Sequence, residues 1–399
     1  MPSFQERNEV PIMGKYEVVV IGGGVAGVGA ALAASRNGAN TLLIEKGVLL
    51  GGLATLGNIG AYLPLCDGRG RKVIGGISEE LLHQSIKYGY DSLSSEWEMG
   101  KETVIDADSR YATIFSPPAF ALALDELLQS AGTDLLFDTL FSSPVLEGES
   151  CKGVIVENKS GRVAYESEVV VDASGDADVM ERAGAECVTS DNWLSYCIYL
   201  TSLDRIGRAL EREDLGKAIS LVCLGGNRDG EGVPQGAREY GGTEGEEVSQ
   251  FILKGREMLR NRIAAKGDEE LPVNLPAMAQ LRTTRRIKSY RDLQEEDVFR
   301  GFEDSIGCAG DFRQAGPVYE IPYRSLLSPS LKNVITAGRT IGAAGDTWEV
   351  TRVIPVAALT GQAAGTAAAL AVEDEVALKN VPRQTLQKAL ADTGVIIHI

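Results

Sequence analysis

The sequence has few of the side chains that most metal and nucleophilic sites need. Its 399 residues include two histidines, His83 and His398, and six cysteines with no CxxC pair. Zinc ribbons, thioredoxin-like redox pairs and cysteine-ligated clusters need closely spaced thiols. We therefore expect no metal site and no catalytic triad. The scattered cysteines are typical of buried, reduced thiols in a cytoplasmic protein. The penultimate His398 is expected to lie on a mobile tail.

Positive charge is also scarce. The chain has 39 Lys and Arg against 56 Asp and Glu, a net charge of −17. Such a chain is repelled by nucleic-acid phosphates and by anionic lipids. The clearest basic cluster, in residues 282–288, is too small for a nucleic-acid face. Residues 1–15 lack the apolar region of a signal peptide, and the uncharged stretches 18–34 and 354–372 lack the Leu, Ile and Phe density of membrane spans. We expect no nucleic-acid or membrane partner.

The length suggests two domains. Residues 16–21 form a β-branched run, a glycine turn and an Ala-rich helical segment follow, and residues 41–44 form a second apolar run. This order predicts a βαβ unit with parallel strands. Residues 134–172 are rich in β-forming residues, whereas residues 201–270 are charge-dense and carry loop signals. We predict an α/β fold whose Rossmann-like domain is discontinuous, over 1–185 and 326–399, with an α+β substrate or cap domain inserted at 186–325.

The sharpest motif is a GxGxxG at the turn after the first strand. Gly22 permits the tight turn, Gly24 lets the backbone approach a pyrophosphate, and Gly27 lets helix and strand pack closely. The N–H groups of the helix terminus can bind phosphate. Glu45, at the end of the second strand, can accept hydrogen bonds from ribose hydroxyls and disfavours a 2′-phosphate. The motif predicts a dinucleotide site but does not separate NAD from FAD.

Three further segments resemble the FAD-dependent oxidoreductase family with the glutathione-reductase-like FAD-binding fold. They are the double-glycine loop at 51–55, the VVVDASGD run at 169–176, and the segment from NVITAGR at 333–339 to GQAAG at 361–365. The resemblance covers residues 16–58, 74–82, 165–186 and 315–372, and it is thin across 190–280. No second GxGxxG follows a strand, so we expect no separate NAD(P)H domain.

The resemblance implies FAD as the cofactor and assigns roles to residues that match the family's motifs. The glycine motif would hold the pyrophosphate, and Glu45 would bind the adenosine ribose. The 51–55 loop would line the flavin side. Val145 would pass beside adenine, and Arg352 and Val353 would lie near the flavin ring. The implied cofactor-binding residues are Gly22, Gly24, Gly27, Glu45, Lys46, Gly51, Gly52, Thr55, Val145, Asp172, Gly175, Gly338, Arg339, Arg352 and Val353.

A helix beginning near Pro355 would serve the flavin electrostatically. Proline suits a first helical turn because it has no N–H to satisfy. The positive end of that helix would point toward Arg352 and would stabilise the negative charge that a flavin gains on reduction. A structural ion pair is the alternative role for Arg352.

The substrate side is less determined by the sequence. The predicted reaction is hydride transfer between FAD and a small organic substrate, for which arginines would favour an anionic or carbonyl-bearing compound. The catalytic candidates are Arg285, Tyr323, Asp346 and Arg352. His83 could act as a base or a flavin attachment point, although a helical surface histidine is the plainer interpretation. An electron-transfer subunit of a larger complex and an FAD-containing isomerase or hydratase remain alternatives, and a homo-oligomer or redox partner stays open.

Overall fold

The computed structural model describes residue 4, residues 9–226 and residues 237–399. A seven-stranded sheet forms its centre, in the order β5-β2-β1-β8-β7-β6, with β16 also pairing with β8. The strands are β1 (Ile12–Ile21), β2 (Thr41–Ile44), β5 (Asp134–Leu136), β6 (Leu140–Glu147), β7 (Ser150–Asn158), β8 (Gly161–Asp172) and β16 (Val334–Thr336). The register of β1 with β2 is parallel, from Val18 opposite Thr41 to Ile21 opposite Ile44. The predicted βαβ unit and the Rossmann-type fold are thus confirmed.

Strand β8 has both parallel and antiparallel partners along its length. It pairs in parallel with β1 from Ala164 to Asp172 and with β16 at its carboxyl end, and its amino half also pairs antiparallel with β7, which forms a hairpin with β6. Parallel strands end together at one edge of a sheet, where ligands of α/β folds bind. The carboxyl ends of β1, β2, β8 and β16 therefore mark the site edge.

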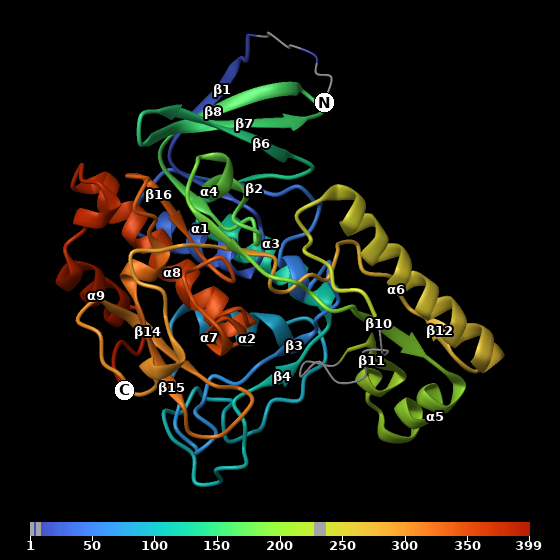
Figure 1. Ribbon diagram of the computed structural model, residues 1–399. Coiled ribbons are helices and arrows are strands. Elements are labelled where there is room, and N and C mark those ends of the chain that lie inside the picture. Colours follow the sequence, from blue (N-terminus) through green and yellow to red (C-terminus); the bar gives the residue numbers. More distant parts are fainter. Residues whose placement is uncertain (1–3, 5–8, 227–236) are drawn as a thin grey trace.

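Helices α1 (Val25–Arg36) and α8 (Ile354–Glu373) pack tightly together beside the sheet (Figure 1). Glycines make this approach possible, because a Cβ atom on Gly361 would lie 2.1 Å from the Ala26 carbonyl oxygen and one on Gly365 would lie 2.0 Å from that of Ala30. Helix α8 is long and apolar enough to cross a membrane, but 89% of its most apolar window is buried inside the protein. Its composition is accounted for by its place in the core.

The remaining elements of the main body surround these two helices. They are α2 (Ile77–Ile86), α3 (Pro117–Ser130), α4 (Asp178–Arg182), α7 (Asp346–Thr351), α9 (Arg383–Asp392), and the short strands β3 (Ala61–Tyr62), β4 (Thr113–Ile114), β14 (Ser305–Gly310) and β15 (Val318–Pro322). Apolar residues of β14 and β15 belong to the same core as β1 and α8. The predicted end of the insertion at 325 therefore does not coincide with the change in packing, since residues 293–327 contribute to the main core.

A second body stands to one side of the main sheet (Figure 1). It contains β10 (Ser195–Thr201), β11 (Ile219–Gly225), β12 (Leu271–Pro272), α5 (Leu203–Arg212) and α6 (Gly245–Lys266), and β9 (Cys187–Thr189) pairs with β13 (Arg285–Ile287) near its connections to the main body. It has small apolar clusters of its own, built where α6 packs on β10 and β11. We refer to residues 190–281 as the cap.

Two sequence predictions about individual side chains were wrong. Cys197 and Cys223, directly opposite each other on β10 and β11, form a disulfide, so not all six cysteines are reduced thiols. His398 is not on a loose tail, because its Nδ1 lies 3.1 Å from both carboxylate oxygens of the buried Glu320. Both pairings join residues distant in sequence, which spacing alone does not reveal.

Candidate functional site

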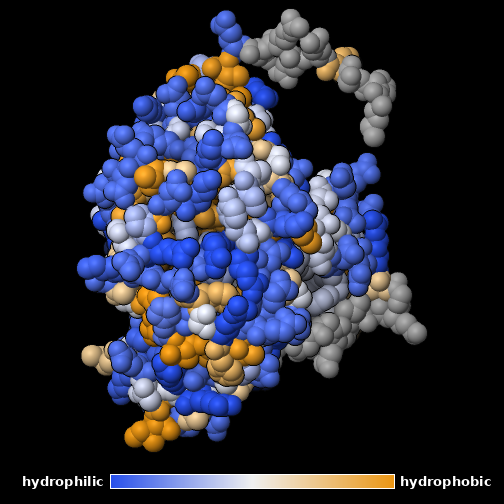
Figure 2. Space-filling model, turned by 60° about the vertical axis from the view of Figure 1, so that its left-hand side comes forward, coloured by the Kyte–Doolittle hydropathy of each residue, from blue (hydrophilic) through white to orange (hydrophobic). Residues whose placement is uncertain are grey.

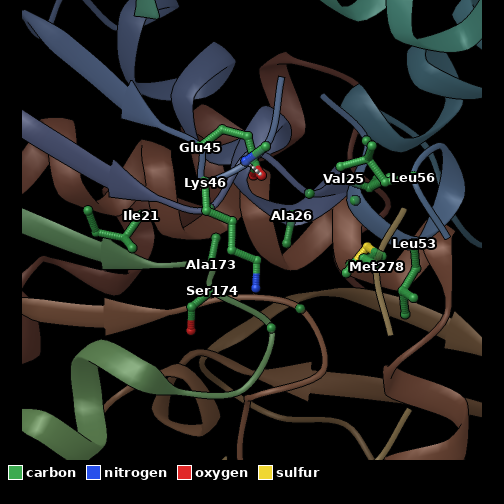
Figure 3. A pocket seen from close by; sticks show the side chains of 18 of the residues that line it. Ile21, Val25, Ala26, Glu45, Lys46, Leu53, Leu56, Ala173, Ser174 and Met278 are labelled. Carbon is green, nitrogen blue, oxygen red and sulfur yellow. Dashed lines mark hydrogen bonds between the residues drawn. The ribbon is translucent and has the colours of Figure 1, made fainter. Parts of the chain in front are cut away.

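A cavity of about 390 Å³ lies at the carboxyl edge of the parallel strands. We call it the glycine-loop cavity. Three glycine-containing turns reach it, at 22–24, 51–52 and 173–175, together with Gly338 and the first turn of α8 (Figure 3). Its remaining side-chain groups come from Ile21, Val25, Ala26, Ile44, Glu45, Lys46, Leu53, Ala54, Leu56, Thr139, Leu140, Phe141, Ala173, Ser174, Asp178, Arg182, Ala277, Met278, Ala337, Arg339, Arg352, Ile354 and Ala357.

The first turn has the geometry that a phosphate cradle requires. Gly22 has φ +100°, and a Cβ atom there would lie 2.4 Å from the Ala173 carbonyl oxygen. Gly24 caps α1 and faces open space, with nothing within 4 Å of a Cβ position. Gly27 does not line the cavity but packs under the turn, where a Cβ atom would lie 1.8 Å from the Gly22 carbonyl oxygen. Unpaired N–H groups of α1 therefore face an unobstructed space.

The acid at the end of β2 organises the loops around it. The buried Glu45 accepts hydrogen bonds from Gly23 N at 2.7 Å and Gly47 N at 2.6 Å. Figure 3 shows this carboxylate turned toward its own loop, while the Lys46 side chain extends toward Ala173 and Ser174. Both residues line the cavity, so an anion near Lys46 would meet a positive charge.

The double-glycine loop is held directly against the first turn. Gly51 N donates to Gly23 O at 2.8 Å, and Gly51 adopts φ +98°. A Cβ atom on Gly52 would lie 3.0 Å from Gly24 Cα. Thr55, also predicted to line the site, is buried with its hydroxyl donating to Leu50 O and does not reach the cavity. Its role is to close the loop.

Asp172 and its neighbours form the opposite wall. Asp172 is fully buried behind the cavity and accepts from Ser174 N, Ser174 Oγ and Met180 N. Burial raises the pKa of this carboxyl to about 6. Gly175 (φ +87°) lines the cavity, and the Arg339 guanidinium packs on it, held by a 2.9 Å contact with Asp176. The Arg339 Nε atom is buried without a hydrogen-bond partner among the described residues.

Cations gather at the end of the cavity next to α8. Arg352 lines the cavity and binds Glu349, and Val353, the N-cap of α8, lies just outside it. Arg282, which directly follows the cap and is absent from the described cavity lining, donates weakly to Gln280 O at 3.4 Å. Burial, with the nearby charges of Arg352 and Arg339, lowers the pKa of Arg282 to about 10. Three guanidinium groups thus raise the positive potential near the first turn of α8.

Three of the four predicted catalytic residues do not line the glycine-loop cavity. Arg285 binds Asp178 and the Asp176 carbonyl, which makes it a structural ion pair beside the site. Tyr323 is buried with its hydroxyl donating to Leu378 O at 2.9 Å. Asp346 begins α7 and pairs with Arg313 at 3.0 Å. Only Arg352 of this set reaches the cavity. Sequence proximity to the family motifs was misleading, because Tyr323 and Asp346 are bound by Leu378 and Arg313, which do not line the cavity.

Two other assignments also change. Val145 points out of β6 and is 38% exposed, whereas Thr139, Leu140 and Phe141 at the start of that strand line the cavity. The β-rich pattern located the strand but not the end that meets the site. His83 lies on α2 with its Nε2 3.1 Å from the Tyr111 hydroxyl, and it is absent from the described cavity lining.

The fold and this cavity define a Rossmann-type dinucleotide-binding protein. The family model for FAD dependent oxidoreductases matches residues 17–250 and 237–390, so the chain belongs to that family, and its cofactor is FAD. Its members are enzymes that use FAD in oxidation and reduction.

A solved structure with a TM-score above 0.5 supports the fold. The structure of p-nitrophenol 4-monooxygenase from Pseudomonas putida is similar to this one, with a TM-score of 0.52 and 13% sequence identity. The similarity covers 95% of this chain and 84% of that chain. A geranylgeranyl bacteriochlorophyll reductase-like protein from Thermoplasma acidophilum has a TM-score of 0.46 at 14% identity over 94% and 82% of the two chains. No curated protein matches this chain. At such identities the likeness concerns the fold.

The residues present fit FAD. The open cradle at Gly24, the unpartnered Arg339 Nε and the cavity cations suit a pyrophosphate, and the apolar Leu53, Ala277 and Met278 suit the ring side. Sequence reasoning did not find Ala277 and Met278, because they lie in the cap segment where no motif is recognisable.

Proposed function

We propose that this protein transfers a hydride between a small organic substrate and FAD bound in the glycine-loop cavity. The observation that carries the proposal is that Arg339 and Arg352 line the cavity at the end next to α8, with Arg282 near enough to both to interact with them electrostatically. FAD supplies the two-electron acceptor for such a reaction. The chain's own residues supply position and charge around it.

Gly22, Gly24 and the α1 N-terminus are proposed to hold the pyrophosphate, and Glu45 the adenosine ribose. Glu45 would then exchange a backbone hydrogen bond for a ribose hydroxyl. Gly51 and Gly52 leave room beside the first turn for the ribityl chain. This division follows from which atoms are open: the cradle is unobstructed, whereas Thr55 and Asp172 are already satisfied internally.

Arg352 and the first turn of α8 place positive charge at one end of the cavity, and Arg282, which is absent from the described lining, lies near enough to Arg352 to interact with it electrostatically. Arg282 has no carboxylate partner among the described residues, in contrast to Arg352, which binds Glu349. A guanidinium free of a carboxylate can bind a substrate carboxylate or carbonyl. We therefore assign substrate contact to Arg282 and cofactor support to Arg352.

Anaerobic titration of the FAD-loaded protein with small oxo acids, hydroxy acids and other carbonyl compounds tests the proposal. Loss of the flavin absorbance on addition of a compound to the protein alone is expected. The Arg282→Gln variant should keep its FAD. At subsaturating substrate its flavin should be reduced at least tenfold more slowly than the flavin of the wild type. Reduction that requires a second protein would instead identify an electron-transfer subunit, and turnover without lasting loss of absorbance would identify an isomerase or hydratase.

A further inference from the structure

A second cavity, of about 360 Å³, lies between the cap and the loops of the main body. We call it the arginine pocket. Its lining comes from α5, from the turn at 215–218, from β11, and from three main-body positions, Gly60, Tyr90 and Ile114. The site described above does not use it.

The charge of the arginine pocket is opposite to that of the whole chain. Arg205, Arg208, Arg212 and Lys217 line it, and its described lining contains no carboxylate. Arg208 and Lys217 pair with acids near them in sequence, Asp204 and Asp214. Arg205 and Arg212 form no ion pair within the described part of the chain. In a protein of net charge −17, four cations around one cavity make a local anion trap.

Helix α5 turns its arginines toward the pocket and its leucines toward solvent, which is the reverse of the usual surface helix. Arg205, Arg208 and Arg212, spaced by three and four residues, share the face toward the pocket. The other face exposes Leu203 (83%) and Leu210 (76%). A surface helix normally buries its leucines and exposes its arginines. Local departures of this kind occur where function requires them, and of these three arginines only Arg208 forms an ion pair within the described residues.

Two tyrosines, Tyr90 and Tyr199, also line the pocket, and each lies close to a glycine. The Tyr90 hydroxyl is buried without a hydrogen bond of good geometry among the described residues, and the Tyr199 hydroxyl is near enough to interact with it. A Cβ atom on Gly60 would lie 1.9 Å from the Tyr199 hydroxyl, and one on Gly216 would lie 3.0 Å from the Tyr90 ring. Burial raises the pKa of both phenols, so they remain hydrogen-bond donors at neutral pH.

One loop connects the two cavities. Leu56 lines the glycine-loop cavity and Gly60, four residues on, lines the arginine pocket. The cap grips this loop, since Gln280 donates to Gly57 O at 2.5 Å and the Asn58 and Asn274 amides bind each other at 3.0 and 3.1 Å. A ligand anchored in the pocket therefore lies against the same loop that borders the cofactor.

We propose that the arginine pocket binds the anionic end of the substrate, a small molecule with two or more carboxylate or phosphate charges. This inference rests on the proposed function, because it makes the pocket the distal part of the substrate site. Arg205 and Arg212 supply the free charges, Tyr90 and Tyr199 donate hydrogen bonds, and Ile219 and Leu221 contact the apolar part of the ligand.

Calorimetric titration of the FAD-loaded protein with citrate, and separately with inorganic pyrophosphate, tests this proposal. FAD fills the phosphate cradle, so binding there cannot be mistaken for binding in the pocket. At least one probe should bind, and the Arg205→Gln/Arg212→Gln variant should raise its Kd at least tenfold. The tighter probe identifies carboxylate or phosphate chemistry. The control, Arg260→Gln/Lys266→Gln on the exposed face of α6, removes the same charge and should bind like the wild type.

Failure of both probes to bind the wild type, or equal binding by the two double variants, would overturn the pocket assignment. FAD content is measured by absorbance on the same samples. Loss of anion binding at full FAD content concerns the pocket alone, whereas protein that takes up no FAD contradicts the proposed function independently.

Discussion

At the scale of single residues, Gly175 determines where Arg339 lies. Its φ is +87°, and a Cβ atom there would lie 2.9 Å from the Arg339 guanidinium, which Asp176 holds in place. The Gly175→Ala variant should displace this guanidinium from the cavity and raise the Kd for FAD at least tenfold, about 1.4 kcal/mol. Fluorescence titration of the apoprotein with FAD measures the change.

Gly184→Ala is the matched control for this prediction. Gly184 has nearly the same φ, +85°, but nothing lies within 4 Å of a Cβ position. Both variants carry the backbone strain of a left-handed alanine, about 1 kcal/mol, and only one of them pushes on Arg339. Equal FAD affinity in the two variants would show that Arg339 does not touch the cofactor.

Residue roles were predictable from the sequence where a motif fixes the backbone. Gly22 and Gly51 lie at the cavity in turns whose positive φ admits little else, and Gly24 lies beside them at the open cradle. Met278, which reaches the cavity from the cap, was not predictable, since its position depends on how distant elements pack. The burial of Tyr323 was not predictable for the same reason, because it follows from a contact with the distant Leu378.

At the scale of elements, the crossing of α1 and α8 positions the phosphate cradle. A Cβ atom on Gly365 would lie 2.0 Å from the Ala30 carbonyl oxygen. The Gly365→Ala variant should therefore lower the free energy of unfolding by about 1–3 kcal/mol, although alanine favours helices. In Gly207→Ala, on α5, nothing lies within 4 Å, so stability should rise by about 0.5–1 kcal/mol. Denaturant unfolding measures both, and a stable Gly365→Ala protein would refute this packing.

The two strands that carry Cys197 and Cys223 give a second element-scale prediction. The disulfide closes a loop of sequence separation 26, for which chain entropy predicts about 3 kcal/mol of stabilisation. Protein denatured without reductant should show four reactive thiols, those of Cys66, Cys151, Cys187 and Cys308. Reduction should expose all six and lower the melting temperature. Six thiols in freshly purified, unreduced protein would contradict the pairing.

Secondary structure was predictable where the hydrophobic pattern is strong. The βαβ unit, α3 and the long helix after residue 353 follow from local sequence, because buried parallel strands and small-residue helices have distinct patterns. The insertion boundary was not, since β14 and β15 join the main core through contacts distant in sequence.

At the scale of the whole molecule, an acidic exterior encloses two cavities with cations at their walls. The face in Figure 2 is mostly hydrophilic, with hydrophobic residues in small separate areas. Ala277 and Met278 of the cap border the glycine-loop cavity, and most of the described lining of the arginine pocket belongs to the cap, so both cavities need the cap to be complete. Cytoplasmic location, self-association and a redox partner remain predictions from the sequence.

The central claim is that FAD sits in the glycine-loop cavity, and the visible absorption spectrum before and after acid precipitation tests it most directly. The described lining of that cavity contains no histidine, cysteine or tyrosine that could bond to a flavin. The purified protein should therefore be yellow, and the flavin bands should move into the supernatant. Colour that stays with the pellet would contradict this lining, and a colourless protein that refuses added FAD would contradict the account as a whole.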